Sequence, residues 1–298
     1  MTYALLVNPR AGGAAAGAAE AARAVLVGAG QAVEVVRCDD RATTAAAVGR
    51  ACERGDVVVA VGGDGTVSSV AGLVAGRGGV LGLVPAGRGN DFARMLGVPP
   101  DPGGAARVLL GGRVERVDLV ACTVPGQPRQ VAVGSVYAGV DARAVELVER
   151  MRWLPTVLQY PVAAVRALAS YTPVDVEVVV DGIGHCFGAA TVVAANSAYY
   201  GAGMRIAPDA SVTDGLLDVV VVASSSRRAL ITAMPTIYGG RHVLRDDVVV
   251  LRGRVVEIHG SPRVPMGADG EPLPDLPARQ APPGRIEALP GALQVLVP

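Results

Sequence analysis

Short apolar runs alternate with longer alanine-rich or amphipathic runs over the first third of the chain. We predict strands at the short runs, which are rich in valine and leucine and end at glycine, proline or polar residues: 3–7, 33–37, 57–61 and 80–84. The longer runs predict helices at 14–27, 43–54, 66–74 and 90–96. Such alternation is typical of a parallel sheet covered on both faces. The pattern therefore predicts a Rossmann-like, three-layer α/β region.

The pattern changes near residue 114 to short β-rich segments separated by tight turns. We predict strands at 114–120, 130–137, 174–180, 186–194, 217–222, 248–251 and 254–259. Turn dipeptides such as Asp181-Gly182 indicate antiparallel pairing. The second part is therefore predicted to be an antiparallel β-sandwich.

Helix and proline patterns mark two further parts of this region. Its one clearly helical insert is 143–168, broken at Pro155 and Pro161. After a proline-rich stretch, 262–283, two short apolar segments at 285–289 and 292–297 flank a turn. We expect these two segments to be strands.

The strand at 57–61 runs directly into Gly62, Gly63, Asp64, Gly65 and Thr66. A buried strand that ends in glycines can bring backbone N–H groups up to a phosphate. The alternative is an ordinary turn, because the chain contains 39 glycines.

Two other strand ends strengthen the phosphate interpretation. Asn8, Pro9, Gly12 and Gly13 follow the first strand, and 85–94 follows the strand at 80–84. Three such ends suit one ligand at the carboxyl edge of a parallel sheet. Neither a Walker A loop nor a complete GxGxxG motif is present.

Taken in order, these motifs resemble the diacylglycerol kinase catalytic domain family, which includes soluble bacterial lipid kinases, sphingosine kinases and ceramide kinases. The resemblance rests on Asn8-Pro9 with Gly12-Gly13, on GGDGT at 62–66 and on 85–94, which reads PAGRGNDFAR. The stretch at 195–222, with its Asp-Gly-x-Leu-Asp step, is similar to a second-domain motif of the family, and Asp269-Gly270-Glu271 to its late acidic motif. The motifs span nearly the whole chain.

The resemblance implies a two-domain kinase with its active site in the interdomain cleft. Residues 1–120 would form the nucleotide-binding domain, to which 277–298 returns, and 121–276 would form the β-rich lipid-substrate domain. The implied reaction is ATP-dependent phosphorylation of the hydroxyl of a neutral lipid such as diacylglycerol, with Mg²⁺. An NAD kinase, which shares GGDGT and a β-rich second domain, and a noncatalytic nucleotide- or lipid-binding regulator remain alternatives.

Candidate nucleotide-binding residues lie at the three strand ends. They are Asn8, Pro9, Gly12, Gly13, Gly62, Gly63, Asp64, Gly65, Thr66, Arg88 and Asn90. Many relatives have threonine where this chain has Arg88, and Asn-Glu where it has Ser68-Ser69. A guanidinium at Arg88 could bind a phosphate through two nitrogen atoms, or it could be a solvated surface charge.

Candidate catalytic carboxylates are Asp64, Asp269 and Glu271. Phosphoryl transfer needs bound phosphates, neutralised charge and an oriented hydroxyl. The resemblance favours Asp269 and Glu271 as a pair that supplies the base, although a solvated acidic turn is the alternative, and the sequence does not say which of the two accepts the proton. If their loop is extended, the two side chains point the same way.

The family also implies a structural magnesium ion, held by an Asp carboxylate and two backbone carbonyls, which we carry to the carboxylate of Asp214 and the carbonyls of Leu216 and Ser211. A hard cation with oxygen ligands suits these positions. Asp118 could join the same acidic network or be a simple turn carboxylate.

Composition narrows the partners. Equal totals of 27 basic and 27 acidic residues argue against a nucleic-acid partner, and the cysteines show no metal-binding spacing. No apolar segment approaches the roughly 18–20 residues that span a bilayer. We therefore expect a cytoplasmic protein with transient contact at the inner membrane face, where 151–160 could meet lipid or, as the more common role, form core. A homodimer is compatible with the sequence.

Overall fold

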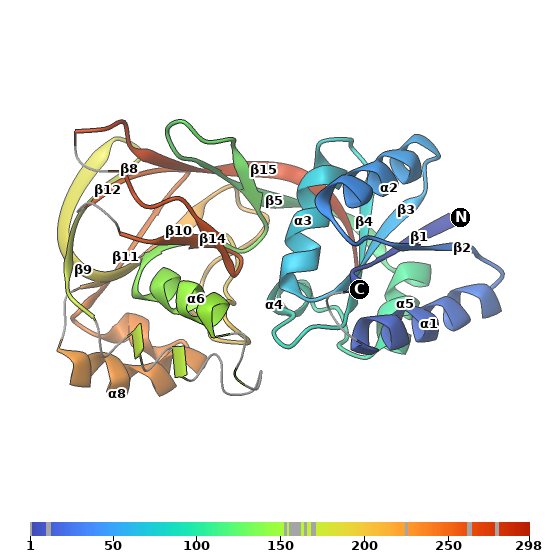
Figure 1. Ribbon diagram of the computed structural model, residues 1–298, viewed down its shortest axis with the longest axis horizontal. Helices are drawn as coiled ribbons and strands as arrows, with labels where there is room; N and C mark the ends of the chain where they lie inside the picture. The colour runs from blue at the N-terminus through green and yellow to red at the C-terminus, as the bar shows by residue number, and fades with distance from the viewer. Residues whose placement is uncertain are drawn as a thin grey trace.

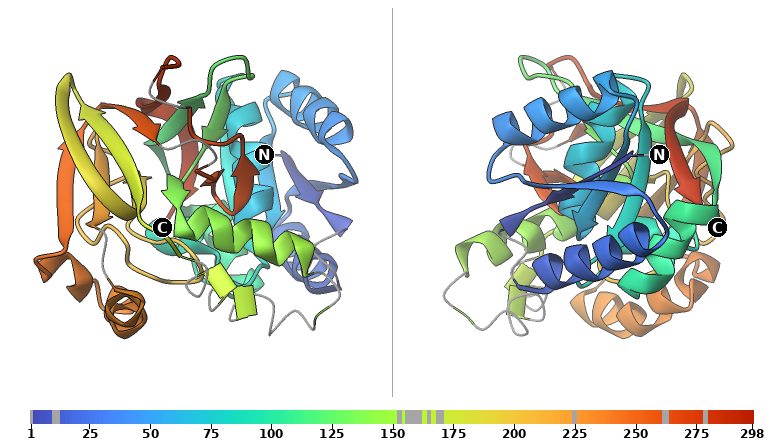
Figure 2. Two further views of the ribbon diagram at one scale, coloured as in Figure 1. Left: turned by 60° about the vertical axis from the view of Figure 1, so that its left-hand side comes forward. Right: turned by 90° about the vertical axis from the view of Figure 1, so that its right-hand side faces the viewer.

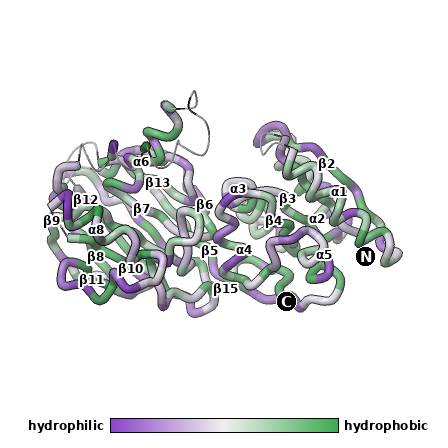
Figure 3. Tube along the Cα trace, turned by 90° about the horizontal axis from the view of Figure 1, so that it is seen from below, coloured by the Kyte–Doolittle hydropathy of each residue, from purple (hydrophilic) through white to green (hydrophobic). Residues whose placement is uncertain are grey.

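The computed structural model describes residues 2–9, 13–151, 154, 162–163, 166–167, 171–223, 226–260, 264–277 and 280–298. Two halves lie side by side and are joined by the long strands β5 (Arg113–Thr123) and β15 (Gly284–Val297) (Figure 1). Hydrophobic positions follow the strands in both halves (Figure 3).

The N-terminal half contains a parallel sheet in the order β2-β1-β3-β4. Its strands are β1 (Thr2–Val7), β2 (Ala32–Arg37), β3 (Val57–Gly62) and β4 (Val80–Pro85). The helices are α1 (Gly13–Gly28), α2 (Arg41–Glu53), α3 (Asp64–Ala75), α4 (Asp91–Met95) and α5 (Pro102–Gly111). α1 and α5 cover one face of the sheet, and α2 and α3 cover the other (Figures 1 and 2). This is the predicted three-layer α/β arrangement. All six residues of β3 are buried, because the strand lies between β1 and β4 inside the sheet.

Helix α5 was not among the sequence predictions, although its signals are present. Asp101 caps the helix, since its Oδ1 accepts the N–H of Gly104 at 2.6 Å, and Pro102 takes the first helical position. Glycines and small residues in its first turn obscured the amphipathic pattern.

The C-terminal half is the predicted β-sandwich-like domain. Its other strands are β6 (Gln130–Ala132), β7 (Ser135–Gly139), β8 (Val174–Val180), β9 (Ile183–Ala195), β10 (Leu217–Ala223), β11 (Val248–Gly253), β12 (Val255–Gly260), β13 (Met266–Ala268) and β14 (Glu271–Leu273). Within the described part of this half, every strand pair is antiparallel. Valine and alanine side chains from both layers form its core.

Two strand predictions in this half need correction, and three further elements were not predicted. The expected strand 130–137 is two strands, β6 and β7, interrupted at 133–134. The two expected strands at 285–289 and 292–297 are one strand, β15, with a register shift between Leu289 and Leu293. The proline-rich stretch contains the hairpin β13–β14. Two helical segments were missed, α8 (Arg227–Tyr238) and the 3₁₀ helix η2 (Arg241–Leu244).

The predicted helix 143–168 is described only in part. Helix α6 spans Val140–Arg150, and residues 162–163 and 166–167 are also helical. Most of the 151–160 stretch, the expected lipid contact, lies outside the described residues. No helix in the described part of the chain is both long and apolar enough to cross a bilayer.

Strand β15 links the two halves. It pairs antiparallel with β12 and with β5, and its last part pairs in parallel with β4 through Gln294 and Val295. Because β15 pairs with strands of both halves, a continuous path of paired strands runs from β14 to β2, and β5, β6, β10 and β11 pair beside it. The acidic hairpin β13–β14 and the glycine-rich end of β3 are thereby held on one framework.

Candidate active site

The glycine loop connects β3 to α3. Gly63 is the N-cap of α3, and Asp64 is the first residue of the helix. A Cβ on Gly62 would lie 2.6 Å from Thr66 Oγ1, and a Cβ on Gly87 would lie 2.3 Å from the Cα of Gly63. Glycine is therefore required where the ends of β3 and β4 touch. The first turn of α3 leaves backbone N–H groups without partners inside the helix, and such a turn favours anions.

The loop after β4 is folded by its own asparagine. Asn90 has a left-handed backbone (φ 52°), and its Oδ1 accepts the N–H of Gly87 at 2.9 Å while its Nδ2 donates to the Gly87 carbonyl at 3.0 Å. The carboxylate of Asp64 accepts the N–H of Phe92 at 3.2 Å. Asn90 therefore shapes the loop rather than pointing at a ligand, whereas Arg88 is exposed on it.

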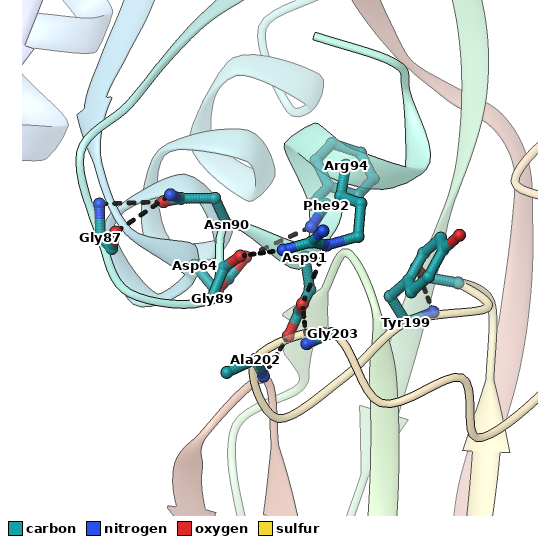
Figure 4. Close-up of polar contacts among 11 residues, drawn as sticks. Asp64, Gly87, Gly89, Asn90, Asp91, Phe92, Arg94, Tyr199, Ala202 and Gly203 are labelled. Carbon is teal, nitrogen blue, oxygen red and sulfur yellow. Dashed lines mark hydrogen bonds and ion pairs between the residues drawn. The ribbon is translucent and has the colours of Figure 1, made fainter. Parts of the chain in front are cut away.

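Asp91 connects the two halves, and it was absent from the predicted site residues (Figure 4). Its carboxylate accepts the backbone N–H groups of Ala202 at 2.8 Å and Gly203 at 2.7 Å. The residue is only 6% exposed. Burial, followed by the charge of Asp64, raises the pKa of Asp91, and the two N–H donors and Arg94 oppose this rise. Asp91 belongs to the NDFAR motif at 90–94, so the sequence could have indicated it as a site residue. Its partners, 111 and 112 residues away, could not be predicted from the motif.

An aromatic ring lies beside this link. The guanidinium carbons of Arg94 and Arg205 lie 5.8 Å and 5.9 Å from the centre of the Tyr199 ring. Arg94 also donates to the Gly89 carbonyl at 3.2 Å. The Arg94 contact, a cation–π interaction, adds to the link between the region after β4 and the 199–205 segment, whereas the Arg205 contact lies within that segment (Figure 4).

Asp269 lies in the turn between β13 and β14. Its Oδ1 accepts the N–H groups of Gly134 and Ser135, each at 3.0 Å. Its Oδ2 accepts the N–H of Val133 and the hydroxyl of Ser68, each at 2.7 Å. The amides that donate to Asp269 belong to residues 133–135, where the expected strand 130–137 is interrupted. Ser68, which replaces the Asn of many relatives, has the Asp269 carboxylate as its hydrogen-bond partner. Burial raises the pKa of the Asp269 carboxyl, and the four hydrogen bonds oppose that rise.

Glu271 is the first residue of β14, and its carboxylate has a different neighbour from that of Asp269. An added Cβ on Gly65 would lie 3.4 Å from Glu271 Oε1, so this carboxylate lies against the first turn of α3. Asp269 has a left-handed backbone (φ 46°), and the N–H of Gly270 donates to the Tyr137 hydroxyl at 3.0 Å. The expectation of an extended loop with both side chains pointing the same way was therefore wrong. The hairpin nevertheless brings both carboxylates to α3.

The predicted nucleotide-binding residues that follow β1 are described only in part. Asn8 and Pro9 are half-buried at this end, Gly13 is exposed at the start of α1, and Gly12 lies outside the described residues. Cys38, which follows β2, donates its N–H to the carbonyl of Val7 at 2.9 Å and is buried. Burial raises the pKa of its thiol.

The predicted metal ligands lie in the turn before β10. Asp214 Oδ1 accepts the N–H of Leu216 at 3.0 Å, and Oδ2 contacts Nη2 of Arg252. The hydroxyl of Ser211 lies 3.2 Å from that of Thr213. A magnesium ion at this turn would have to displace the Arg252 guanidinium, which is half-exposed, from the Asp214 carboxylate. The described residues hold no group of three or more His, Cys, Asp or Glu side chains that could bind a metal.

Asp118, expected as a turn carboxylate or part of a metal network, instead joins three segments. It is buried in β5, and its carboxylate accepts the N–H groups of Gly215 and Gly291, each at 2.7 Å. Gly291 lies at the register shift of β15. Asp118 therefore fixes the turn before β10 to the strand that joins the two halves.

Two protein-family models match nearly the whole chain, including the residues of the candidate site. Residues 2–122 match the diacylglycerol kinase catalytic domain, and residues 134–297 match the YegS C-terminal NAD kinase beta sandwich-like domain. The glycine loop thus belongs to the first match, and the acidic hairpin belongs to the second.

Proteins of similar sequence carry names that agree with the two family-model matches. A protein named diacylglycerol kinase from Mycobacterium tuberculosis is 36% identical over 301 residues, which cover 98% of this chain and 94% of the relative. A protein named "Probable lipid kinase YegS-like" from Xanthomonas oryzae pv. oryzae is 30% identical, covering 72% of each chain.

A solved structure shares the fold. The crystal structure of a diacylglycerol kinase from Bacillus anthracis strain Sterne aligns with a TM-score of 0.75 at 21% identity, covering 100% of this chain and 97% of the other. With both domain matches and a relative 36% identical over almost its whole length, the chain belongs to the family of diacylglycerol kinases and YegS-like lipid kinases.

Proposed function

We propose that this protein is an ATP-dependent kinase that phosphorylates the hydroxyl of a neutral lipid such as diacylglycerol. The observation that carries the proposal is the meeting of Glu271 with Gly65, which brings the acidic hairpin of the β-rich half to the glycine loop of the α/β half. The name of the Mycobacterium tuberculosis relative supports the substrate class. We assign the nucleotide to 1–120 with 277–298, and the lipid to 121–276.

The phosphates are assigned to the first turn of α3. Its backbone N–H groups, together with the Thr66 hydroxyl, offer donors at the positive end of a helix of 12 residues. Mg²⁺ bound with the nucleotide would neutralise charge that develops on the phosphates during transfer. The exposed Arg88 supplies a further cation on the neighbouring loop.

The transfer step needs one base. The lipid hydroxyl oxygen forms a bond to the γ-phosphorus as the bond from that phosphorus to the β,γ-bridging oxygen breaks, so that ADP leaves. The hydroxyl proton passes to the carboxylate pair of Asp269 and Glu271.

The contacts of the two carboxylates differ in a way that kinetics can resolve. Asp269 has two donors on each oxygen, so it can accept a substrate hydroxyl only by exchanging one of them, and Ser68 is the one hydroxyl among them. Glu271 is exposed beside the proposed phosphate site. If Asp269 is the base, S68A retains turnover while D269N loses it; if Glu271 is the base, E271Q loses turnover without loss of stability.

The test is transfer of labelled γ-phosphate from Mg-ATP in mixed micelles. Diacylglycerol, monoacylglycerol, ceramide, sphingosine and an isoprenoid alcohol serve as acceptors, with NAD in parallel. A labelled organic-phase product that disappears in D64N supports the proposal and identifies the lipid. Label on NAD alone, or no labelled product with any lipid, would overturn it.

A further inference from the structure

Helix α8 carries apolar side chains on its outward face. Ile231 is 55% exposed and Tyr238 is 56% exposed, and they are seven positions apart, so they lie on one side of the helix two turns apart. Leu244 in the adjoining η2 is 81% exposed. Single exposed apolar residues are ordinary, but three within 14 residues of chain call for a physical account.

These side chains are not needed to hold α8 in place. The inward-facing Leu230 packs against Tyr171 and Ala190, and Ile237 packs against another core cluster. The Ser226 hydroxyl caps the helix by accepting the N–H of Ala229 at 3.2 Å. The outward apolar groups therefore remain available after the fold is complete.

Arginines surround the apolar positions. Residues 227–247 contain four arginines and two aspartates, a net charge of +2 in a chain whose formal net charge is 0. Arg245 is paired with Asp247, with nitrogen–oxygen distances of 2.7 Å and 2.8 Å. Arg228 and Arg241 are exposed and form no ion pair within the part of the chain that the structure describes. Their charge is complementary to an anionic surface.

This surface is connected to the candidate active site. The backbone N–H of Arg205 donates to the carbonyl of Ile237 at 3.1 Å, and His242 Nε2 lies 2.9 Å from the carbonyl of Ile206. The 199–206 segment thus joins the end of α8 to the loop that binds Asp91. Figures 1 and 2 show α8 on the outside of the C-terminal half.

We propose that the α8–η2 surface, formed by Arg228, Ile231, Tyr238, Arg241 and Leu244, docks the protein on an anionic lipid surface. The apolar side chains enter the boundary between headgroups and acyl chains, and the two arginines bind anionic headgroups. The proposal rests on the proposed function, because a lipid kinase must reach its substrate in a membrane. Docking here places the 199–206 segment close to the lipid.

Vesicle binding of the full-length protein tests the proposal. Wild type is cosedimented with phosphatidylcholine vesicles and with vesicles that also contain phosphatidylglycerol, and it should prefer the latter. The double variant I231E/L244E should bind the anionic vesicles more weakly by about tenfold or more, since it loses apolar burial and adds two repelled charges. R228Q/R241Q should lose about tenfold or more and also lose the preference for phosphatidylglycerol.

The matched control is I183E. Ile183 is 66% exposed at the turn between β8 and β9, outside the α8–η2 surface, so its substitution should leave vesicle binding unchanged. Circular dichroism melting of every variant separates lost docking from lost folding.

Two further outcomes would overturn the proposal. One is wild-type-like vesicle binding by both double variants. The other is a dimer in gel filtration that I231E/L244E dissociates, which would assign the surface to a second copy of the chain. A monomeric short-chain diacylglycerol separates this inference from the proposed function, because the docking variants should phosphorylate it at the wild-type rate even where vesicle binding is lost.

Discussion

Replacing Asp269 by asparagine tests whether this carboxylate holds the two halves together at the site. Asparagine keeps the size of the side chain and tolerates the left-handed backbone at φ 46°. At the Oδ1 position the new NH₂ group would face two backbone N–H groups, neither of which can accept from it. At the Oδ2 position it would face the Val133 N–H and the Ser68 hydroxyl, which can turn and accept. The substitution therefore removes at least one hydrogen bond without creating a cavity.

The magnitude follows from these contacts. A hydrogen bond to a charged group contributes about 1.5–3 kcal/mol, so the gross loss in the orientation that keeps the Ser68 contact is about 1.5–3 kcal/mol. Burial of the charge raises the pKa of Asp269, and the neutral amide is relieved of that cost. We expect the free energy of unfolding of D269N to fall by about 1–3 kcal/mol.

Urea denaturation of wild type and D269N at neutral pH measures this change, with E271Q as the matched control. Glu271 is exposed two residues away, so E271Q should change the unfolding free energy by no more than about 0.5 kcal/mol. Hydrogen exchange should also quicken in D269N at the three amides that Asp269 binds. If D269N unfolds at the wild-type urea concentration and these amides keep their protection, the positioning role given to Asp269 is refuted.

Three other perturbations follow from the same geometry. D91A should lower the free energy of unfolding by about 2–3 kcal/mol and expose the amides of the 199–206 segment to exchange, because two hydrogen bonds between the halves are lost; unchanged exchange would contradict the link. G87A should lose nucleotide binding, measured by calorimetry, because its Cβ would lie 2.3 Å from the Cα of Gly63, whereas G17A, with nothing within 4 Å, should bind normally. Burial raises the pKa of Asp141, so its contribution to stability is complete below the unfolded pKa of about 4 and is lost as pH rises through the folded pKa. The hydroxyls of Thr191 and Tyr200 donate to Asp141 Oδ2 at 2.9 Å and 3.3 Å, and the amide oxygen of an asparagine can still accept them. D141N should therefore melt higher than wild type at pH 7 and no higher near pH 4, and equal melting curves at pH 7 would refute this.

Metal dependence can be examined without catalysis. Because Arg252 neutralises Asp214, adding Mg²⁺ or a chelator should leave the melting temperature of the nucleotide-free protein unchanged. A clear rise with Mg²⁺ would instead restore the metal site that the family resemblance implies at this turn.

The sequence by itself determined the α/β region and the place of the glycine loop. Both follow from local rules: a six-residue buried strand such as β3 has a short apolar pattern, and a close approach such as that of Gly63 to Gly87 excludes side chains. The order of the motifs was also enough to indicate the family. Helix α8 was missed because Pro235 and several β-branched residues weaken its helical pattern, and its inward packing is a tertiary property.

Only the tertiary structure decided what the acidic residues contact. Asp269 accepts from Ser68 across 201 residues of chain and from three amides 134 to 136 residues away, and Asp91 binds amides 111 and 112 residues away. The family resemblance implied a metal at Asp214, and nothing in the sequence indicated Arg252 there: the register of β10 on β11 sets Asp218 opposite Arg252, whose guanidinium reaches Asp214. Such pairings depend on strand order and register, which bring distant residues together, and no local propensity encodes them.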